Sequence, residues 1–191
     1  MSLHLAHTDP FAARQRAALL SCEHHALGVD PGLTGAIARL GPDGLEVEDM
    51  PRLASDGRLV DAQALFELPI LYTALPGSHA TIEAVHAMPR QGVASAFNFG
   101  RSVGRAEGVL ACLFGPSLHA VTPQVWKFGV GLRAIPGAAL KDRKDASRAL
   151  ASRLFPDDAH RWKLAKHDGR AEAVLIAWYC WQTFVLRDVA P

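Results

Sequence analysis

Four acidic residues of this 191-residue chain occupy positions where an unpaired charge is costly. Asp30 ends the apolar run 26–29 and precedes a Pro-Gly turn, and Glu83 lies among the aliphatic residues of 80–85. Asp168 and Glu172 are four positions apart at the start of an apolar segment, so on a helix both side chains project from one face. A carboxylate in apolar surroundings is unfavourable unless a cation or hydrogen bonds satisfy it. These positions therefore indicate either a cation site or carboxylates with structural partners.

Each interpretation has a physical basis. Asp30 could cap the turn that follows it, and Glu172 could be a helix N-terminal charge that interacts favourably with the macrodipole. Oxygen ligands from several separate elements are what Mg²⁺ or Mn²⁺ prefers. Two such ions about 4 Å apart activate a water and stabilise the leaving oxygen of a phosphodiester. Because Asp168 and Glu172 repel each other, we expect a divalent cation to compensate their charge.

Composition narrows the class of protein. Cys22, Cys112 and Cys180 are widely spaced and include no C-x-x-C pair, which argues against a zinc site or a disulfide framework and fits a reducing cytoplasm. A formal net charge of +1 is not that of a strongly basic nucleic-acid binder, although basic residues outnumber acidic ones between 127 and 170. That segment forms either a positive binding face or an ordinary solvated helix surface.

A single domain over residues 23–191 is the simplest organisation, preceded by an extension, 1–22, that we expect to be partly disordered or a short helix. No run approaches the roughly 18 apolar residues that span a bilayer, and the first residues lack the pattern of a secretory signal. We therefore expect a cytoplasmic protein with no membrane partner. His24 and His25 precede a predicted strand, where consecutive side chains diverge, so we expect them at the surface.

The order of predicted elements is typical of a mixed α/β fold. Strands are predicted around a tight turn within 26–38, then at 45–48, 80–85 and 117–121. Helices are predicted at 60–74, where Pro69 introduces a kink or an end, and at 94–114, 124–127, 141–155 and 169–186. This order predicts an antiparallel meander of three strands followed by parallel strands, flanked by helices.

The predicted helix 94–114 carries Gly100, Gly104 and Gly108 at a spacing of four residues. These glycines form either a groove where another backbone comes close or a weak helix, since each costs about 1 kcal/mol relative to alanine.

Several motifs in consistent order resemble one nuclease family. They are Gly-Val-Asp-Pro-Gly at 28–32, Ile-Glu at 82–83 and His-Asp-Gly-Arg-Ala-Glu-Ala at 167–173. Together they resemble the RuvC family of Holliday junction resolvases, within the ribonuclease H-like superfamily. Val-Thr-Pro-Gln-Val-Trp-Lys at 121–127, followed by Lys-Asp-Arg-Lys at 141–144, resembles the phage-borne and chloroplast branches of that family. The resemblance covers most of the chain, from Leu27 to Trp178.

The resemblance implies a ribonuclease H-like fold and a homodimeric, Mg²⁺-dependent endonuclease that nicks opposing strands of a four-way DNA junction. It implies two ions in each active site, with Mn²⁺ able to replace Mg²⁺, no protein nucleophile and no nucleotide cofactor. The implied metal ligands and catalytic residues are Asp30, Glu83, Asp168 and Glu172.

The same resemblance implies the DNA contacts. Helix 94–114 occupies the place where family members form much of the dimer contact and present an aromatic side chain to the junction. Phe97 or Phe99 would stack on an unpaired base, with Arg101 on the same helix, although core packing is the alternative for either phenylalanine. Four basic residues would neutralise phosphates or transition-state charge: Lys127, Lys141, Arg143 and Lys144.

The last acidic motif departs from the family pattern. Many family members place their final two metal ligands three positions apart, as two aspartates or as a histidine and an aspartate. Here the spacing from Asp168 is four and the second residue is Glu172. Whether His167 or Asp168 is the outer ligand stays open, although a separation of five residues turns His167 away on a helix.

Other functions compete with the junction nuclease. A junction-binding module would keep the fold without cleaving, but the acidic set is complete. A nuclease acting on flaps, RNA–DNA hybrids or other branched substrates would use the same metal pair. An ATP-dependent kinase of the actin-like superfamily also opens with a Gly-Val-Asp-Pro-Gly type loop, but this chain is short for two lobes and shows no second phosphate loop.

Overall fold

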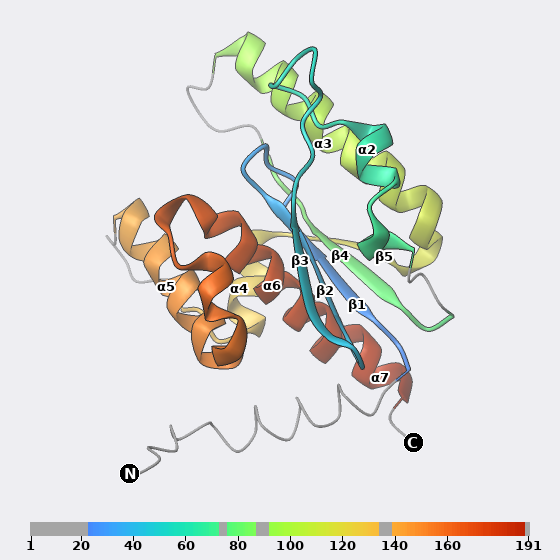
Figure 1. Ribbon diagram of the computed structural model, residues 1–191, viewed down its shortest axis with the longest axis vertical. Coiled ribbons are helices and arrows are strands. Elements are labelled where there is room, and N and C mark those ends of the chain that lie inside the picture. The colour runs from blue at the N-terminus through green and yellow to red at the C-terminus, as the bar shows by residue number, and fades with distance from the viewer. Residues whose placement is uncertain (1–22, 73–75, 87–91, 134–138, 190–191) are drawn as a thin grey trace.

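A five-stranded mixed sheet forms the centre of the protein, with strands in the order β3-β2-β1-β4-β5 (Figure 1). The computed structural model describes residues 23–72, 76–86, 92–133 and 139–189; the side chains of Leu140, Lys141 and Arg143 are also outside the description. The strands are β1 (Ala26–Val29), β2 (Ala36–Gly41), β3 (Gly44–Asp49), β4 (His79–Glu83) and β5 (Leu118–Val121).

The strand directions confirm the predicted topology. β1, β2 and β3 pair antiparallel in sequence order, which is the predicted meander. β4 joins the other side of β1 in parallel, and β5 pairs in parallel with β4. β1 is therefore a central strand, and all four of its residues are buried, as its apolar sequence predicts.

Helices cover both faces of the sheet (Figure 1). One face carries α2 (Ala62–Phe66) and the long α3 (Val93–Phe114), and the other carries α4 (Pro123–Gly129), α5 (Leu140–Leu154) and α6 (Asp168–Cys180). After α6 the chain continues as a π-helical segment (Trp181–Val185) and α7 (Leu186–Val189). Short 3₁₀ segments are formed by Pro69–Leu71, Gly115–Ser117, Pro156–Trp162 and Ala165–His167.

Alternation along β1 separates two hydrophobic cores. Leu27 and Val29 pack in the core that includes α3, whereas Ala26 packs in the core around α6. Gly28 also faces α6, because a Cβ atom built on it would lie 2.0 Å from the backbone nitrogen of Ala177. A side chain at this position would therefore push α6 off the sheet. By the same alternation, the residue that follows β1 projects toward α6.

Two predictions of local structure need correction, the first only in the extent of a helix. The segment 60–74 does not form one helix in its described part: α2 ends before Pro69, which opens a separate 3₁₀ turn because its ring excludes an interior helical position. His25 is buried rather than exposed, with only 4% of its surface accessible. Its ring lies against Gly41 of β2, where a Cβ atom would be 2.1 Å away, so the missing side chain makes room for the imidazole.

The extension 1–22, for which we predict partial disorder or a short helix, lies outside the described residues. None of the described helices combines the length and apolar character needed to cross a membrane.

Candidate active site

The two strand-borne carboxylates occupy matching positions at one end of the sheet. β1 and β4 are parallel neighbours, and Val29 is in register with Ile82. The next residues along the two strands are Asp30 and Glu83. Both project toward α6, since Thr81, two positions before Glu83, lies against the thiol of a cysteine on that helix. Two acidic side chains thus meet at the carboxyl ends of adjacent parallel strands.

Asp30 serves the turn and is also desolvated. Its Oδ1 atom accepts a hydrogen bond from the backbone N–H of Gly32 at 3.1 Å, so the interpretation of Asp30 as a turn cap is correct for this oxygen. Burial raises the pKa of Asp30 to about 7, and the carboxylates of Glu172 and Glu83 act in the same direction. A carboxyl group in this state loses its proton readily when a cation approaches.

Glu83 is held by an indole group. The Nε1–H of Trp126, in α4, donates a hydrogen bond to Oε2 of Glu83 at 2.8 Å. Burial raises the pKa of Glu83 and the charge of Glu172 adds to this, while the Trp126 hydrogen bond opposes it. Within the described residues, neither Asp30 nor Glu83 forms an ion pair.

The other two carboxylates lie on α6, as predicted. Asp168 is the first residue of the helix and Glu172 follows one turn later. Gly169 brings this helix start close to the turn after Asp30, because a Cβ atom on it would lie 2.2 Å from the carbonyl oxygen of Thr34. The close packing at Gly169 explains how α6 delivers its acidic residues to the end of β1.

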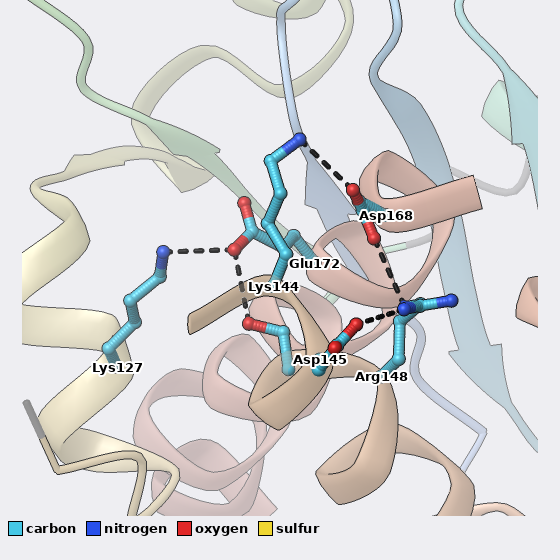
Figure 2. A network of polar contacts seen from close by, with 7 residues as sticks. Lys127, Lys144, Asp145, Arg148, Asp168 and Glu172 are labelled. Carbon is cyan, nitrogen blue, oxygen red and sulfur yellow. Dashed lines mark hydrogen bonds and ion pairs between the residues drawn. The ribbon is translucent and has the colours of Figure 1, made fainter. Parts of the chain in front are cut away.

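Cationic side chains from α4 and α5 contact both carboxylates of α6 (Figure 2). Lys127 Nζ lies 2.9 Å from Oε1 of Glu172, and the Ser147 hydroxyl donates to the same oxygen at 3.1 Å. Lys144 Nζ lies 3.0 Å from Oδ2 of Asp168. Each carboxylate of α6 therefore has an ammonium partner.

Arg148 extends this network. Its Nε lies 3.2 Å from Oδ1 of Asp168, and its guanidinium also pairs with Asp145 one turn earlier on α5. The Nε contact is not aligned as a hydrogen bond, so within the described residues Oδ1 of Asp168 is a buried oxygen without a hydrogen-bond donor. The Asp168 carboxylate therefore has cationic partners but lacks a hydrogen bond to one of its oxygens.

These contacts change one expectation from the sequence. The repulsion between Asp168 and Glu172 does not require a divalent cation, because Lys127, Lys144 and Arg148 already compensate it. Within the described residues, no three His, Cys, Asp or Glu side chains lie together in a way that could hold a metal ion. The four candidate ligands are neighbours, but they do not form a closed coordination site in this arrangement.

The donor chemistry nevertheless fits a hard divalent cation. All four candidates offer carboxylate oxygens, Asp30 and Glu83 lack an ion partner among the described residues, and Oδ1 of Asp168 lacks a donor. On α6, Lys127 and Ser147 contact Oε1 of Glu172 and Lys144 contacts Oδ2 of Asp168, so a bound ion would compete with these lysines for the charge of both carboxylates.

His167 has different neighbours from the four carboxylates. It precedes α6 and is half-buried, and desolvation lowers its pKa together with the nearby cations Arg170 and Lys166. Asp49, on the edge strand β3, acts in the opposite direction. Asp168 instead faces the cations of α5, so the two candidates for the outer ligand lie in different electrostatic surroundings.

The predicted DNA-binding residues lie in two places. On α3, Phe97 is 65% exposed and Phe99 is half-buried, and the guanidinium carbon of Arg101 lies 5.7 Å from the centre of the Phe97 ring. Lys127 and Lys144 lie at the carboxylates instead. The side chains of Lys141 and Arg143 are outside the described residues.

Three residues of the site were not among the predicted ones: Trp126, Ser147 and Arg148. Trp126 belongs to a motif that supports the family resemblance, but its type alone indicates core packing. Ser147 and Arg148 follow Lys144 by three and four positions, so they share its helix face, and this spacing was the available signal.

Comparisons with known proteins add no family: no family model matches this sequence, and no curated protein matches it. The resemblance is therefore carried by the motifs themselves. The structure brings residues of four of these motifs together at one end of the sheet, since Asp30, Glu83, Lys127 and Glu172 interact electrostatically.

Proposed function

We propose that this protein is a metal-dependent endonuclease of ribonuclease H-like fold, related to the RuvC family, that resolves four-way DNA junctions. The observation that supports this most is the pair of carboxylates at matching ends of β1 and β4. Glu172 lies close enough to raise the pKa of both Asp30 and Glu83. Grouped, desolvated carboxylates that lack an ion partner are a frequent mark of functional sites.

Asp30, Glu83, Asp168 and Glu172 would hold Mg²⁺ or Mn²⁺. When bound, such ions supply Lewis acidity toward phosphodiester oxygens and lower the pKa of water. The lysines have a separate task. Lys127 and Lys144 offer ammonium groups for phosphate oxygens once they leave the α6 carboxylates, and these groups would stabilise negative charge that develops at the scissile phosphate.

The surface of α3 supports the proposal that two copies act together on branched DNA. The exposed Phe97 can stack on an unpaired base, and Arg101 beside it can contact a phosphate. Among the described residues nothing lies within 4 Å of a Cβ built on Gly100, Gly104 or Gly108, so this line of glycines faces outward. A second copy packed there would supply the second active site that paired nicks require.

A gel assay on three labelled substrates tests the function. The substrates are a mobile four-way junction, a duplex of matching sequence and an RNA–DNA hybrid, each with Mg²⁺, with Mn²⁺ and with EDTA. We expect symmetric paired nicks in the junction alone, lost with EDTA. A junction that is retarded but uncut in Mg²⁺ and in Mn²⁺ would support a binding module instead, and cleavage of the hybrid would change the substrate while keeping the metal site.

A further inference from the structure

Helix α4 connects two of the candidate ligands through adjacent residues. Trp126 donates its indole N–H to Glu83 on β4 at 2.8 Å, and Lys127 contacts Glu172 on α6 at 2.9 Å. The two residues of α4 also touch each other, since the ammonium of Lys127 lies 4.8 Å from the centre of the Trp126 ring. A continuous chain of contacts therefore links the carboxylate of a strand to that of a helix.

The two contacts differ in how easily they can be given up. Trp126 is completely buried and packs in the core around α6, so its indole has one position. The side chain of Lys127 is about one-third exposed and is long and flexible. Lys127 can leave Glu172 without disturbing the core, whereas Trp126 stays with Glu83.

We propose that Trp126 is a positioning residue for Glu83 in metal binding. This inference rests on the proposed metal-dependent function. The indole holds Oε2 of Glu83 and fixes the rotation of the carboxylate, so that Oε1 would be the oxygen offered to an ion. Groups that hydrogen-bond a metal-binding carboxylate orient it before the ion arrives, and their loss commonly weakens metal affinity by about 10- to 100-fold.

The chain offers a matched control. Trp162 is also completely buried, and its Nε1–H donates to the hydroxyl of Ser152 at 2.9 Å. Trp126→Phe and Trp162→Phe each remove the hydrogen bond that the indole of a buried tryptophan donates and leave an aromatic ring in place. Both variants lose stability through the same kind of change, but only Trp126→Phe removes a contact to a candidate ligand.

The first experiment is a titration of Mn²⁺ into the purified protein and the two variants, in which the concentration of free Mn²⁺ is measured. We expect Trp126→Phe to weaken binding by about tenfold and Trp162→Phe to leave it unchanged. In the background of Glu83→Ala, which removes the acceptor, the further change Trp126→Phe should have no additional effect on Mn²⁺ affinity, because the two residues act through one contact. Equal Mn²⁺ affinities for wild type and Trp126→Phe would overturn the inference.

A second measurement on the wild-type protein does not depend on a variant that folds. Addition of Mg²⁺ should shift the indole N–H resonance of Trp126 in the ¹H–¹⁵N spectrum and leave that of Trp162 in place. Bound Mg²⁺ with an unmoved Trp126 resonance contradicts the positioning role alone. Failure of wild type to bind either ion contradicts the proposed function itself, so the two failures can be told apart.

Discussion

Asp30 and Glu83, at the ends of β1 and β4, differ from Asp168 and Glu172, on α6, in what balances their charge. The strand-borne pair has hydrogen bonds from a backbone N–H and an indole, and no ion pair among the described residues. The helix-borne pair contacts two lysines and an arginine. All four carboxylates lie near one end of the same sheet, yet the large rise in pKa caused by burial is that of Asp30.

The difference shows where an added cation is most favourable. Desolvation and two neighbouring carboxylates disfavour the ionised form of Asp30. A divalent ion would take the place of the proton and stabilise that ionised form. At Glu172 the ammonium of Lys127 already compensates the charge of the carboxylate, so an ion there would meet a competing cation. We infer that the strand-borne pair would contribute most of the free energy of ion binding. The α6 pair would contribute less, because lysine and arginine side chains compete with the ion for its charge.

The largest effect is expected from Asp30→Asn. This change keeps an oxygen for the hydrogen bond with Gly32 but removes the charge, so we expect cleavage of a four-way junction to fall by about 10³-fold or more. Retardation of the junction in a native gel should persist, because Asp30 is not among the predicted DNA contacts. The control is Glu67→Gln, which changes an exposed acidic residue outside the site. Full activity of Asp30→Asn would contradict the assignment of Asp30 as a metal ligand.

The pH dependence of stability should also single out Asp30. Since its folded-state pKa is raised from 3.8 to about 7, the folded state binds more protons than the unfolded state between these values, so this residue stabilises the metal-free protein as the pH falls from 8 to 5. His25 and His119 act in the opposite direction, because burial lowers their pKa values.

The comparison of wild type with Asp30→Asn isolates this one residue. Urea unfolding at pH 5.5 and at pH 8 should show that the gain in stability of Asp30→Asn over wild type is roughly 1–3 kcal/mol larger at pH 8 than at pH 5.5. An equal effect of the substitution at both pH values would mean that Asp30 is not desolvated in solution.

The strand-borne pair could be predicted from the sequence, and the pairing of the helix-borne carboxylates could not. Asp30 ends an apolar run and Glu83 lies within another, so strand pattern marks both as unusual carboxylates, and the family resemblance implies that they share one site. The contact between Lys127 and Glu172 joins residues 45 positions apart, and it depends on how α4 packs against α6. Side-chain partners between distant elements leave no periodic signal in the sequence. The sequence therefore predicts a divalent cation between Asp168 and Glu172, where the structure has lysine side chains.

His25 illustrates a second limit of sequence patterns. Its burial depends on Gly41, which lies opposite it on β2 and has no side chain to exclude the imidazole. A glycine at a strand end does not show in the sequence which side chain will occupy the space that it leaves. The split of 60–74 is a different case, because Pro69 marks the break and only the extent of the first helix was overestimated.

Lys127→Met should sharpen the distinction between the two carboxylate pairs. Removing the ammonium frees Glu172 and lowers the local positive charge, so we expect Mn²⁺ to bind several-fold more tightly in the absence of DNA, an effect of about 1 kcal/mol. Calorimetric titration of Mn²⁺ provides the measurement. Lys163→Met, at an exposed position outside the network, should leave the affinity unchanged, and weaker binding by Lys127→Met would show that Lys127 does not compete with the ion.

The smallest effect is expected at Asp49, an acidic residue that also contacts α6 but from the edge strand. Its two carboxylate oxygens each lie 2.6 Å from nitrogens of Arg170, and this hydrogen-bonded pair lowers the pKa of Asp49. Because the Asp49 side chain is more than half exposed, the pair is expected to contribute only about 0.5–1 kcal/mol above pH 4, and this contribution is lost as the pH falls through the lowered pKa.

Asp49→Asn should therefore reduce the free energy of unfolding slightly at neutral pH and leave Mn²⁺ affinity unchanged. Urea unfolding and Mn²⁺ titration of the same sample measure both quantities. A marked loss of Mn²⁺ binding in Asp49→Asn would show that any carboxylate near the start of α6 supports the ion through general charge. An unchanged affinity, together with the loss expected for Asp30→Asn, restricts the effect to the carboxylates at the ends of β1 and β4 and to the helix that faces them.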